Sequence, residues 1–333
     1  MSVGALRIGL LGAGRIGRIH GANIAAHPRA RLAAVADAVP ERGEALAAAT
    51  GSHVRDAGSI LADPEIDAIL ICTPTDLHAG LIEAAARQGK AVFCEKPVDL
   101  DAARIRQCLE VVAGAGTSLM IGFNRRFDPS FSALRTRLRG GEIGEPEIVT
   151  IISRDPAPPP LDYLARSGGL FRDMMIHDLD MARFLLADEP VEVHAVGACL
   201  VDPAIGAAGD IDTAAILLKT ASGKIAQISC SRRASYGYDQ RIEVHGAKGL
   251  LAAGNRFATT VTRAGAEGYA SDPALPFFLE RYADAYRLEL DAFVAAVLDA
   301  GPVSPSGEDG LRAQILADAA TEAARNGRPV RVG

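Results

Sequence analysis

The sequence predicts a doubly wound α/β domain followed by an α+β domain. The first part of the chain alternates short, continuously apolar segments with segments rich in Ala, Leu, Glu and Arg. Segments that are apolar throughout are typical of strands covered on both faces, as in a parallel sheet flanked by helices. Gly51, Gly89 and Gly116 each follow a helical segment, as a C-cap does. The expected strands are Arg7–Leu11, Arg31–Ala36, Ala68–Ile71, Ala91–Cys94 and Ser118–Gly122, and the expected helices are Ile16–Ala26, Glu41–Thr50, Leu77–Gln88 and Ala102–Ala113.

The pattern changes after about residue 122, where longer segments with alternating polar and apolar residues begin. Such alternation predicts strands with one face on a core and the other available, as in an open, mostly antiparallel sheet. The expected strands are Glu147–Arg154, Glu192–Val201, Thr213–Thr220, Lys224–Arg232 and Gln240–His245, and the expected helices are Gly169–Leu186, Phe277–Leu298 and Gly310–Arg325. Pro156–Pro160 is a stiff connector. We therefore expect two domains, 1–122 and 123–333.

Composition excludes several classes of protein. The 333 residues are 49% hydrophobic and 23% charged, with a net charge of −6, and no basic run suggests a nucleic-acid surface. The apolar stretches are shorter than about 18 residues, so no membrane span is expected. Five scattered cysteines and a first segment without the pattern of a signal peptide favour a cytoplasmic protein.

A glycine-rich turn between the first expected strand and helix predicts a Rossmann domain that binds a dinucleotide. The motif is Gly12-Ala13-Gly14-Arg15-Ile16-Gly17. Its glycines permit a tight turn, close approach of the backbone to a pyrophosphate, and packing of helix on strand. Asp37 ends the second strand, where a carboxylate binds the ribose 2′-hydroxyl and repels a 2′-phosphate. NAD is therefore favoured over NADP, unless Arg15 and Arg42 weaken that preference.

Two further segments follow strands at the same edge of the expected sheet, where ligands bind in such folds. Thr73, Pro74 and His78 are candidate cofactor contacts, although Thr-Pro is also an ordinary turn. Glu95-Lys96-Pro97 follows the strand Ala91–Cys94, and the proline keeps Lys96 extended. A lysine there can hold a substrate hydroxyl, or can simply be solvated.

Asp173 and His177 are four residues apart on an expected helix, and so lie on one face. Oxidation of an alcohol needs a base for the hydroxyl proton, and histidine suits this because its pKa is near neutrality. The alternatives are a surface ion pair and, with Asp180, a metal site. No further cluster of ligands is evident, so no metal is expected.

These motifs together resemble the glucose–fructose oxidoreductase/inositol dehydrogenase (Gfo/Idh/MocA) family over nearly the whole chain. The likeness extends to Gly122–Asp128, Ser153–Pro156, Ile176–Phe184 and Ser235–Asp239. It implies that Lys96, Asp173 and His177 are catalytic, with His177 as the general base, Lys96 binding the reacting hydroxyl and Asp173 supporting both. The implied cofactor contacts are Gly12, Ala13, Gly14, Arg15, Ile16, Asp37, Thr73, Pro74, His78, Glu95 and Lys96.

The same resemblance implies a polyol pocket that includes Asn124, Arg125, Asp155 and Tyr236 beside the three catalytic residues. Position 124 is asparagine where some members carry methionine. Family members pack the open sheet of the second domain against another subunit, which implies a homotetramer.

The expected function is NAD-dependent oxidation of a secondary alcohol on a cyclic polyol, with myo-inositol as the leading candidate and an inosose as the product. The alternatives are a dehydrogenase of scyllo-inositol or of a cyclic sugar, and a non-catalytic regulator that senses a dinucleotide. A regulator could dispense with the three catalytic side chains, and this chain retains them.

Overall fold

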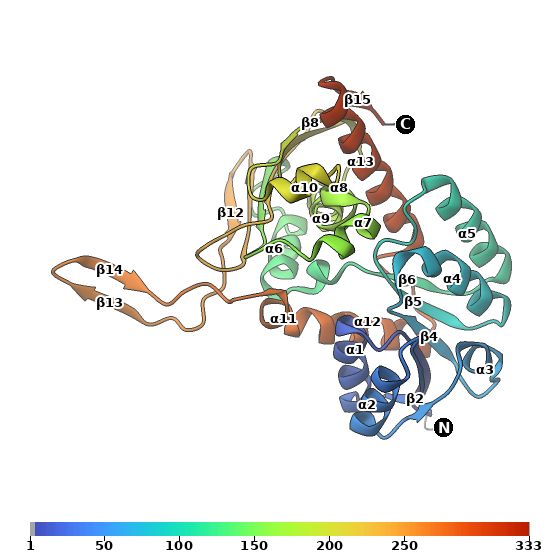
Figure 1. The fold of residues 1–333 in the computed structure, drawn as a ribbon. Coiled ribbons are helices and arrows are strands. Elements are labelled where there is room, and N and C mark those ends of the chain that lie inside the picture. Colours follow the sequence, from blue (N-terminus) through green and yellow to red (C-terminus); the bar gives the residue numbers. More distant parts are fainter. Residues whose placement is uncertain (1–3, 333) are drawn as a thin grey trace. The chain divides into compact units, whose positions relative to one another are not determined.

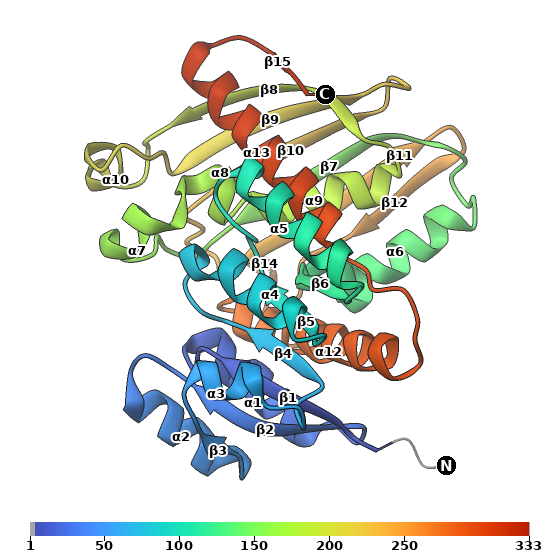
Figure 2. The same ribbon diagram turned by 90° about the vertical axis from the view of Figure 1, so that its right-hand side faces the viewer.

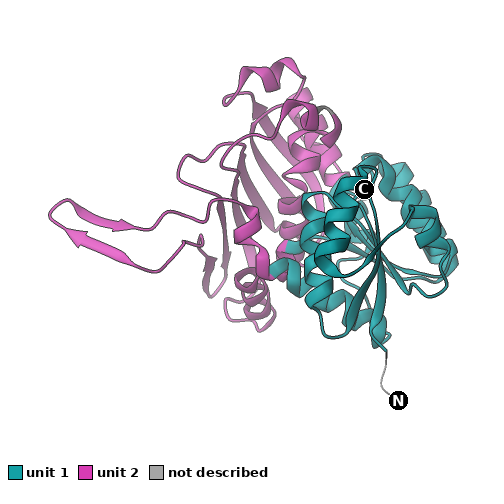
Figure 3. Cartoon of the chain, turned by 60° about the horizontal axis from the view of Figure 1, so that its bottom comes forward, with its two compact units in different colours: residues 1–124, 285–314 teal, residues 125–284, 315–333 magenta. Residues whose placement is uncertain are grey.

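The computed structural model describes residues 4–332, which divide into two compact units (Figure 3). Unit 1 consists of the residues up to Asn124 together with Ala285–Gln314, and unit 2 of Arg125–Asp284 together with the residues from Ile315 onward. The sequence placed 285–314 in the second domain, and the structure corrects this. The physical reason is a long-range contact: the ring of Phe293 packs against that of Phe93, with centroids 5.7 Å apart.

The sheet of unit 1 consists of six parallel strands in the order β3-β2-β1-β4-β5-β6. This is the strand order of a Rossmann fold, and it confirms the predicted α/β architecture. The strands are β1 (Leu6–Leu11), β2 (Ala30–Ala36), β3 (His53–Val54), β4 (Ala68–Ile71), β5 (Ala91–Glu95) and β6 (Leu119–Gly122). Every residue of β4 is buried, as its continuous apolar sequence predicted.

The helices of the first part of unit 1, up to Gly122, agree closely with the expected ones. They are α1 (Arg15–Ala26), α2 (Pro40–Thr50), α3 (Ala57–Ala62), the short 3-10 helix η1 (Thr75–Leu77), α4 (His78–Arg87) and α5 (Ala102–Ala115). Gly51 and Gly116 cap α2 and α5 in the left-handed region, with φ of 68° and 65°. The sequence missed α3 and β3, because elements of six and two residues are too short to show a period.

The sheet of unit 2 is mixed, in the order β12-β11-β7-β10-β9-β8-β15 (Figure 2). Among the described strands of this sheet, β7 and β10 pair in parallel and the other neighbours are antiparallel. The strands are β7 (Pro146–Arg154), β8 (Pro190–Ala198), β9 (Thr213–Thr220), β10 (Ile225–Ser231), β11 (Asp239–Gly246), β12 (Gly249–Ala253) and β15 (Val330–Arg331). The predicted open, mostly antiparallel sheet is confirmed, apart from its one parallel pair.

One face of this sheet is buried and the other is open. Helix α9 (Ile176–Leu186) packs against β7 and β10 on the buried face. On the open face Leu217 is 49% exposed and Val196 is 68% exposed. A shallow hollow of about 610 Å³ lies over this face. The alternation of polar and apolar residues in the sequence therefore corresponds to one buried and one exposed face of the sheet.

Two helices expected as continuous are interrupted. The expected helix Gly169–Leu186 is divided into α8 (Gly169–Asp173) and α9, and the expected helix Phe277–Leu298 into α11 (Phe278–Arg281) and α12 (Ala283–Leu298). At the first break the N–H groups of Met174 and Met175 both donate to the carbonyl of Leu170, at 3.1 and 3.0 Å. This shifts the hydrogen-bond register by one residue, which hydrophobic periodicity does not reveal.

The remaining helices are η2 (Asn124–Phe127), α6 (Pro129–Arg139), α7 (Leu161–Ser167), α10 (Pro203–Ala207) and α13 (Gly307–Asn326). A hairpin of β13 (Thr262–Gly265) and β14 (Gly268–Ser271), which the sequence did not predict, extends away from β12 (Figure 1). Within residues 4–332, none of the helices combines the length and the apolarity that a membrane span requires.

Candidate functional site

The turn after β1 has the geometry that a dinucleotide requires. Gly12 has φ of +97°, and a Cβ there would lie 2.5 Å from the carbonyl oxygen of Cys72. Gly17 is more tightly packed, since its Cβ would lie 1.9 Å from the carbonyl oxygen of Gly12. A Cβ on Gly14 would meet no atom within 4 Å, so the space beside it is open to a ligand. The three glycines thus serve the turn, the helix packing and the approach of a ligand, respectively.

Helix α1 begins at this turn with N–H groups suited to an anion. Gly14 caps the helix without a side chain, and the first turn contains no acidic residue. The first N–H groups of a helix have no partner within it and carry partial positive charge, which favours a phosphate. The predicted contacts Ala13, Arg15 and Ile16 belong to this segment, and Arg15 is exposed. The turn therefore fits the pyrophosphate of NAD.

Asp37 is fixed beside the same turn. Its Oδ2 accepts a hydrogen bond of 2.6 Å from the N–H of Ala13, and its Oδ1 accepts one of 2.8 Å from the N–H of Val39. A carboxylate oxygen has a second lone pair, so both oxygens retain acceptor capacity for a ribose hydroxyl. The hydrogen bond to Ala13 ties the proposed ribose contact directly to the proposed phosphate contact.

Thr73 and Pro74 follow β4 and lie next to the glycine turn. A Cβ on Gly12 would lie 2.8 Å from the nitrogen of Thr73. The hydroxyl oxygen of Thr73 is buried and has no hydrogen-bond partner among the described residues. Buried polar atoms are nearly always satisfied, so this hydroxyl is a candidate contact for a ligand. Pro74 is exposed at the start of η1.

His78, which was predicted to contact the cofactor, lies between the two loops that follow β4 and β5. Its side chain is buried, with Nδ1 at 2.7 Å from the carbonyl oxygen of Pro97 and Nε2 at 2.8 Å from that of Thr73. Burial lowers the pKa of His78, so the ring is neutral at pH 7 and donates one hydrogen bond at a time. We therefore assign His78 to the support of the two loops that follow β4 and β5.

Glu95 and Lys96 lie at the carboxyl end of β5, as predicted. Glu95 is the last residue of the strand, and its Oε1 is 2.8 Å from Nε2 of His20. The side chain of Lys96 is partly exposed. Both residues belong to unit 1, whereas Asp173 and His177 belong to unit 2.

In unit 2, the parallel pairing of β7 with β10 brings Asp155 and Arg232 to one edge of the sheet. Arg154 and Ser231, the last residues of the two strands, are paired, and the N–H of Asp155 donates to the carbonyl of Ser231 at 3.0 Å. Burial raises the pKa of Asp155 to about 7, although the cations of Arg232 and Arg125 lower it. Near neutral pH this carboxyl can therefore either donate to or accept from a substrate hydroxyl.

Asp173 is held by two residues that the sequence analysis did not identify. The hydroxyl of Tyr163 donates to its Oδ1 at 2.8 Å, and Nη2 of Arg232 lies 3.5 Å from its Oδ2. Arg232 is fully buried, and also lies 3.8 Å from Oδ2 of Asp210. Burial and the carboxylate of Asp173 together raise the pKa of Tyr163, so its phenol stays protonated and continues to donate.

His177 is the second residue of α9 and is partly exposed. It was expected to share one helix with Asp173, but Asp173 ends α8 and two residues separate the helices. Asp180, the third member of the alternative metal site, is engaged by Arg126, whose Nε is 2.7 Å from its Oδ2.

The other residues of the expected polyol pocket differ in burial and in their hydrogen-bond partners. Asn124 is buried, at the start of η2. Arg125 is buried in an ion pair with Asp178, so its guanidinium supports the fold of unit 2. Tyr236 is half exposed, and its hydroxyl donates to Oδ2 of Asp239 at 2.7 Å. Asp155 and Asp173 are thus brought together around Arg232, whereas Arg125 and Tyr236 have carboxylate partners of their own.

Local sequence patterns reveal neither of the two residues that the sequence analysis missed. Arg232 is one residue beyond β10, and only the parallel neighbour β7 gives it a functional position. Tyr163 lies on α7, where a single tyrosine carries no signal of its own.

Replacing Asp37 is expected to change the choice of cofactor. Asp37→Ser removes the carboxylate, so we expect the Kd for NADH to rise roughly tenfold to a hundredfold, because hydrogen bonds to charged groups contribute about 1.5–3 kcal/mol. The affinity for NADPH should rise relative to NADH. Fluorescence titration with both nucleotides measures this.

Asp37→Asn is the matched control for the turn itself. Its amide oxygen can still accept from the N–H of Ala13 while the negative charge is lost, so it separates charge repulsion from support of the turn. An unchanged NADH affinity in both variants would remove Asp37 from the cofactor site.

Family models match both parts of the chain. Residues 6–123 match the model described as an oxidoreductase family with an NAD-binding Rossmann fold, and residues 131–252 match the Gfo/Idh/MocA C-terminal domain. The inositol 2-dehydrogenase of Rhizobium meliloti is 55% identical over 327 residues, covering 98% of this chain and 99% of that protein.

Solved structures agree over the same length. A myo-inositol dehydrogenase from Corynebacterium glutamicum is 46% identical with a TM-score of 0.95, covering 99% of both chains. A scyllo-inositol dehydrogenase from Lactobacillus casei, crystallised with NAD(H) and scyllo-inositol, is 33% identical with a TM-score of 0.92, covering 98% of this chain and 99% of the other. The chain, with its NAD-binding Rossmann unit, belongs to the Gfo/Idh/MocA family of oxidoreductases.

Proposed function

We propose that the protein oxidises myo-inositol to an inosose, with NAD as the acceptor of hydride. The observation that carries the proposal is the 55% identity, over almost the whole of both chains, to a protein named inositol 2-dehydrogenase. The polar groups around Asp155 and Asp173 support it, since carboxyl, guanidinium and phenol groups suit a neutral ring that bears many hydroxyls.

We assign the chemical roles to Lys96, Asp173 and His177. His177 takes the proton of the reacting hydroxyl, while the hydrogen on the same carbon leaves as hydride. Lys96 donates to the reacting oxygen and stabilises negative charge on it as the proton departs. Asp173 supports the reaction from unit 2, and its own position is maintained by Tyr163 and Arg232. NAD, when bound, supplies the carbon that accepts the hydride.

A second candidate function is the oxidation of scyllo-inositol or of a cyclic sugar. The observation that favours it is the similarity to the Lactobacillus casei enzyme, which was crystallised with scyllo-inositol. The isomers differ in the face of the ring on which a hydroxyl lies, so the same carboxyl and phenol groups suit either.

We propose that the open face of the unit 2 sheet packs against a second copy of the chain, and that the protein is a homotetramer. The open face carries apolar side chains from four adjacent strands: Ile148, Val196, Leu217 and Ile225. Contiguous apolar surface of this kind marks an interaction site, and a self-complementary face favours a symmetric assembly.

Loss of the proposed base or lysine is expected to abolish most turnover. His177→Ala should lower kcat by about 10²–10⁴-fold, the usual contribution of a general base, and Lys96→Ala should cause a loss of similar size. Steady-state assays of NADH formation from myo-inositol measure kcat. NADH binding and circular dichroism serve as controls for folding. Normal turnover in either variant would exclude that residue from the chemistry.

A panel of polyols is expected to distinguish the two candidate substrates. We expect kcat/KM to be highest for myo-inositol among myo-inositol, scyllo-inositol, glucose and galactose, with NADH absorbance as the readout. The His177→Ala variant gives the background rate. A higher value for scyllo-inositol or for a sugar would support the second candidate function instead.

A charge on the open sheet face is expected to break the assembly. Leu217→Glu places a carboxylate in the apolar surface, so the mass from light scattering should fall towards the 34.7 kDa of one chain. Val54→Glu is the matched control, because Val54 is equally exposed (47%) but lies on β3 of unit 1. A monomeric native protein would contradict the proposal.

A further inference from the structure

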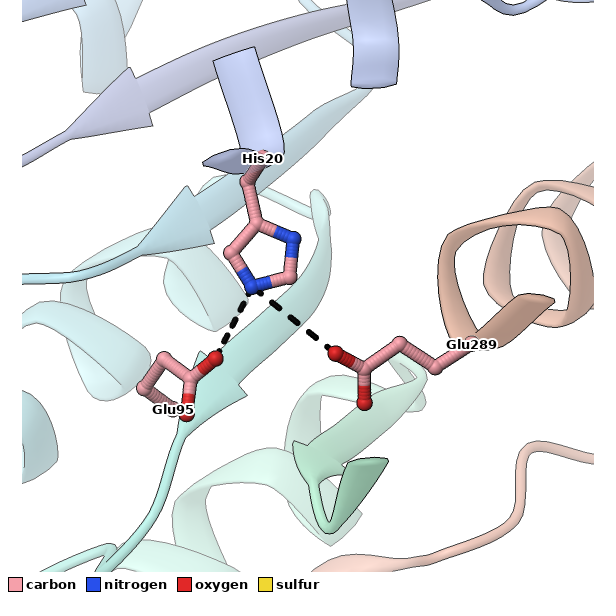
Figure 4. Close-up of side chains that lie close together, drawn as sticks. All are labelled: His20, Glu95 and Glu289. Atoms are coloured by element: carbon pink, nitrogen blue, oxygen red, sulfur yellow. Dashed lines mark hydrogen bonds and ion pairs between the residues drawn. The ribbon is translucent and has the colours of Figure 1, made fainter. Parts of the chain in front are cut away.

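A buried histidine and two carboxylates meet inside unit 1 (Figure 4). His20 comes from α1, Glu95 ends β5, and Glu289 lies on α12. Nε2 of His20 is 2.8 Å from Oε1 of Glu95 and 3.9 Å from Oε1 of Glu289. The side chains of His20 and Glu289 are fully buried, and that of Glu95 is 12% exposed.

The surroundings of this cluster are apolar. The rings of Phe93 and Tyr286 pack against the imidazole of His20 in edge-to-face arrangements, with centroid distances of 5.1 and 5.7 Å. Two ionised carboxylates so close together in such an environment would repel each other and would lack solvation. This environment therefore disfavours ionisation of both carboxyls and favours a proton on one of them.

Glu289 is the carboxyl that is neutral. Neither of its oxygens has a hydrogen-bond partner among the described residues, whereas Glu95 is bonded to His20. Burial raises the pKa of Glu289 well above its ordinary value, and the charge of Glu95 raises it further. The cluster has two other titratable neighbours, the phenol of Tyr286, which packs against His20, and the thiol of Cys72. Burial raises the pKa of the Cys72 thiol, and the charge of Glu289 would raise it further.

The Glu95 carboxylate is confined on its second side by the neighbouring strand. A Cβ added to Gly122 of β6 would lie 2.9 Å from Oε2 of Glu95. Glu95 is thus enclosed between His20 and the backbone of β6. Two residues further along, the carbonyl of Pro97 is within hydrogen-bond distance of His78. Lys96 lies between these two anchored residues.

We propose that His20 and Glu289 are positioning residues for Lys96. His20 donates from Nε2 to Glu95 and holds the end of β5, while Glu289, as a neutral carboxylic acid, fills the space beside the ring without adding charge. This inference rests on the proposed catalytic role of Lys96. Neither His20 nor Glu289 is assigned contact with the substrate.

A divalent cation is the alternative occupant of the cluster. The three ligand-type atoms lie within 4.8 Å of one another. However, the 2.8 Å between His20 and Glu95 is the length of a hydrogen bond, whereas ligands around a tetrahedral metal, each at about 2.1 Å from it, lie roughly 3.4 Å apart. The geometry therefore favours a proton over a metal ion.

The first test measures the proton on Glu289 through stability. The folded state holds this proton at pH values where the unfolded chain, with an ordinary pKa near 4.5, has lost it. Stability must then fall as pH rises above about 4.5, up to the pKa of the folded state. Glu289→Gln keeps the shape and cannot ionise, so its stability should exceed that of the native protein by a margin that grows as pH rises from about 5 to about 8.

Urea unfolding midpoints of both proteins, measured across that range, decide this point. Parallel curves for the native protein and Glu289→Gln would overturn the neutral carboxyl. Stabilisation of the native protein by added Zn²⁺ or Mg²⁺, absent from Glu289→Gln, would overturn the proposal in favour of a metal site. Neither readout needs enzymatic activity, so this test remains valid if the proposed function fails.

The second test measures the positioning of Lys96. His20→Leu removes the donor to Glu95, whereas His20→Gln keeps an N–H donor at a similar distance along the side chain. We expect His20→Leu to lower kcat about tenfold or more with myo-inositol, while the Kd for NADH changes less than about twofold. Such a result would show that Lys96 is misplaced for the reaction although the cofactor still binds. His20→Gln should recover a large part of kcat.

Equal kcat values in both variants and the native protein would overturn the positioning role. A loss of kcat that His20→Gln does not rescue, accompanied by an equal loss of NADH affinity or by unfolding, would show a merely structural histidine. If the native protein oxidises no polyol at all, the proposed function fails, and the stability test alone then reports on the cluster.

Discussion

The parallel hydrogen bonding of unit 1 is the constraint on which its candidate residues depend. The strands β1, β2, β4 and β5 all run in the same direction, so their carboxyl ends meet at one edge. The glycine turn, Asp37, Thr73 and Lys96 are each attached to one of these ends. Direct contacts then join them, as Asp37 accepts from the N–H of Ala13 and His78 lies between Thr73 and Pro97. A single change of strand order would separate these contacts.

Unit 2 also contains a parallel pair of strands, β7 and β10, within a sheet whose other described neighbours are antiparallel. Because β7 and β10 run in parallel, Asp155 and Arg232 emerge side by side. The guanidinium of Arg232 then reaches Asp173 on α8, so a sheet edge and a helix end share one cation. A buried arginine between carboxyls keeps them in place while leaving their oxygens able to bind hydroxyls. The mixed topology is therefore what assembles the candidate substrate site.

Buried ion pairs secure the segment that follows β6. Arg125 pairs with Asp178, Arg126 with Asp180, and Asp128, which caps α6, with Arg281. Burying charges costs solvation, and only close pairing with additional hydrogen bonds compensates for it. These ion pairs therefore stabilise the fold of unit 2. Arg125, which was expected in a polyol pocket, pairs with Asp178, and its cation also lowers the pKa of Asp155.

Local rules of the sequence determined the elements and the cofactor half of the site. Continuous apolarity predicted the parallel strands, and the spacing of three glycines and one aspartate predicted the dinucleotide turn, because both depend on residues close together in the chain. Tertiary structure alone decided that α12 belongs to unit 1, that the chain breaks between α8 and α9, and that Arg232 and Tyr163 contact Asp173. The contact between His20 and Glu289 was also decided by tertiary structure, because the two residues are 269 positions apart. Hydrophobic periodicity predicts that a helix face is buried, but it does not predict which residues pack against that face.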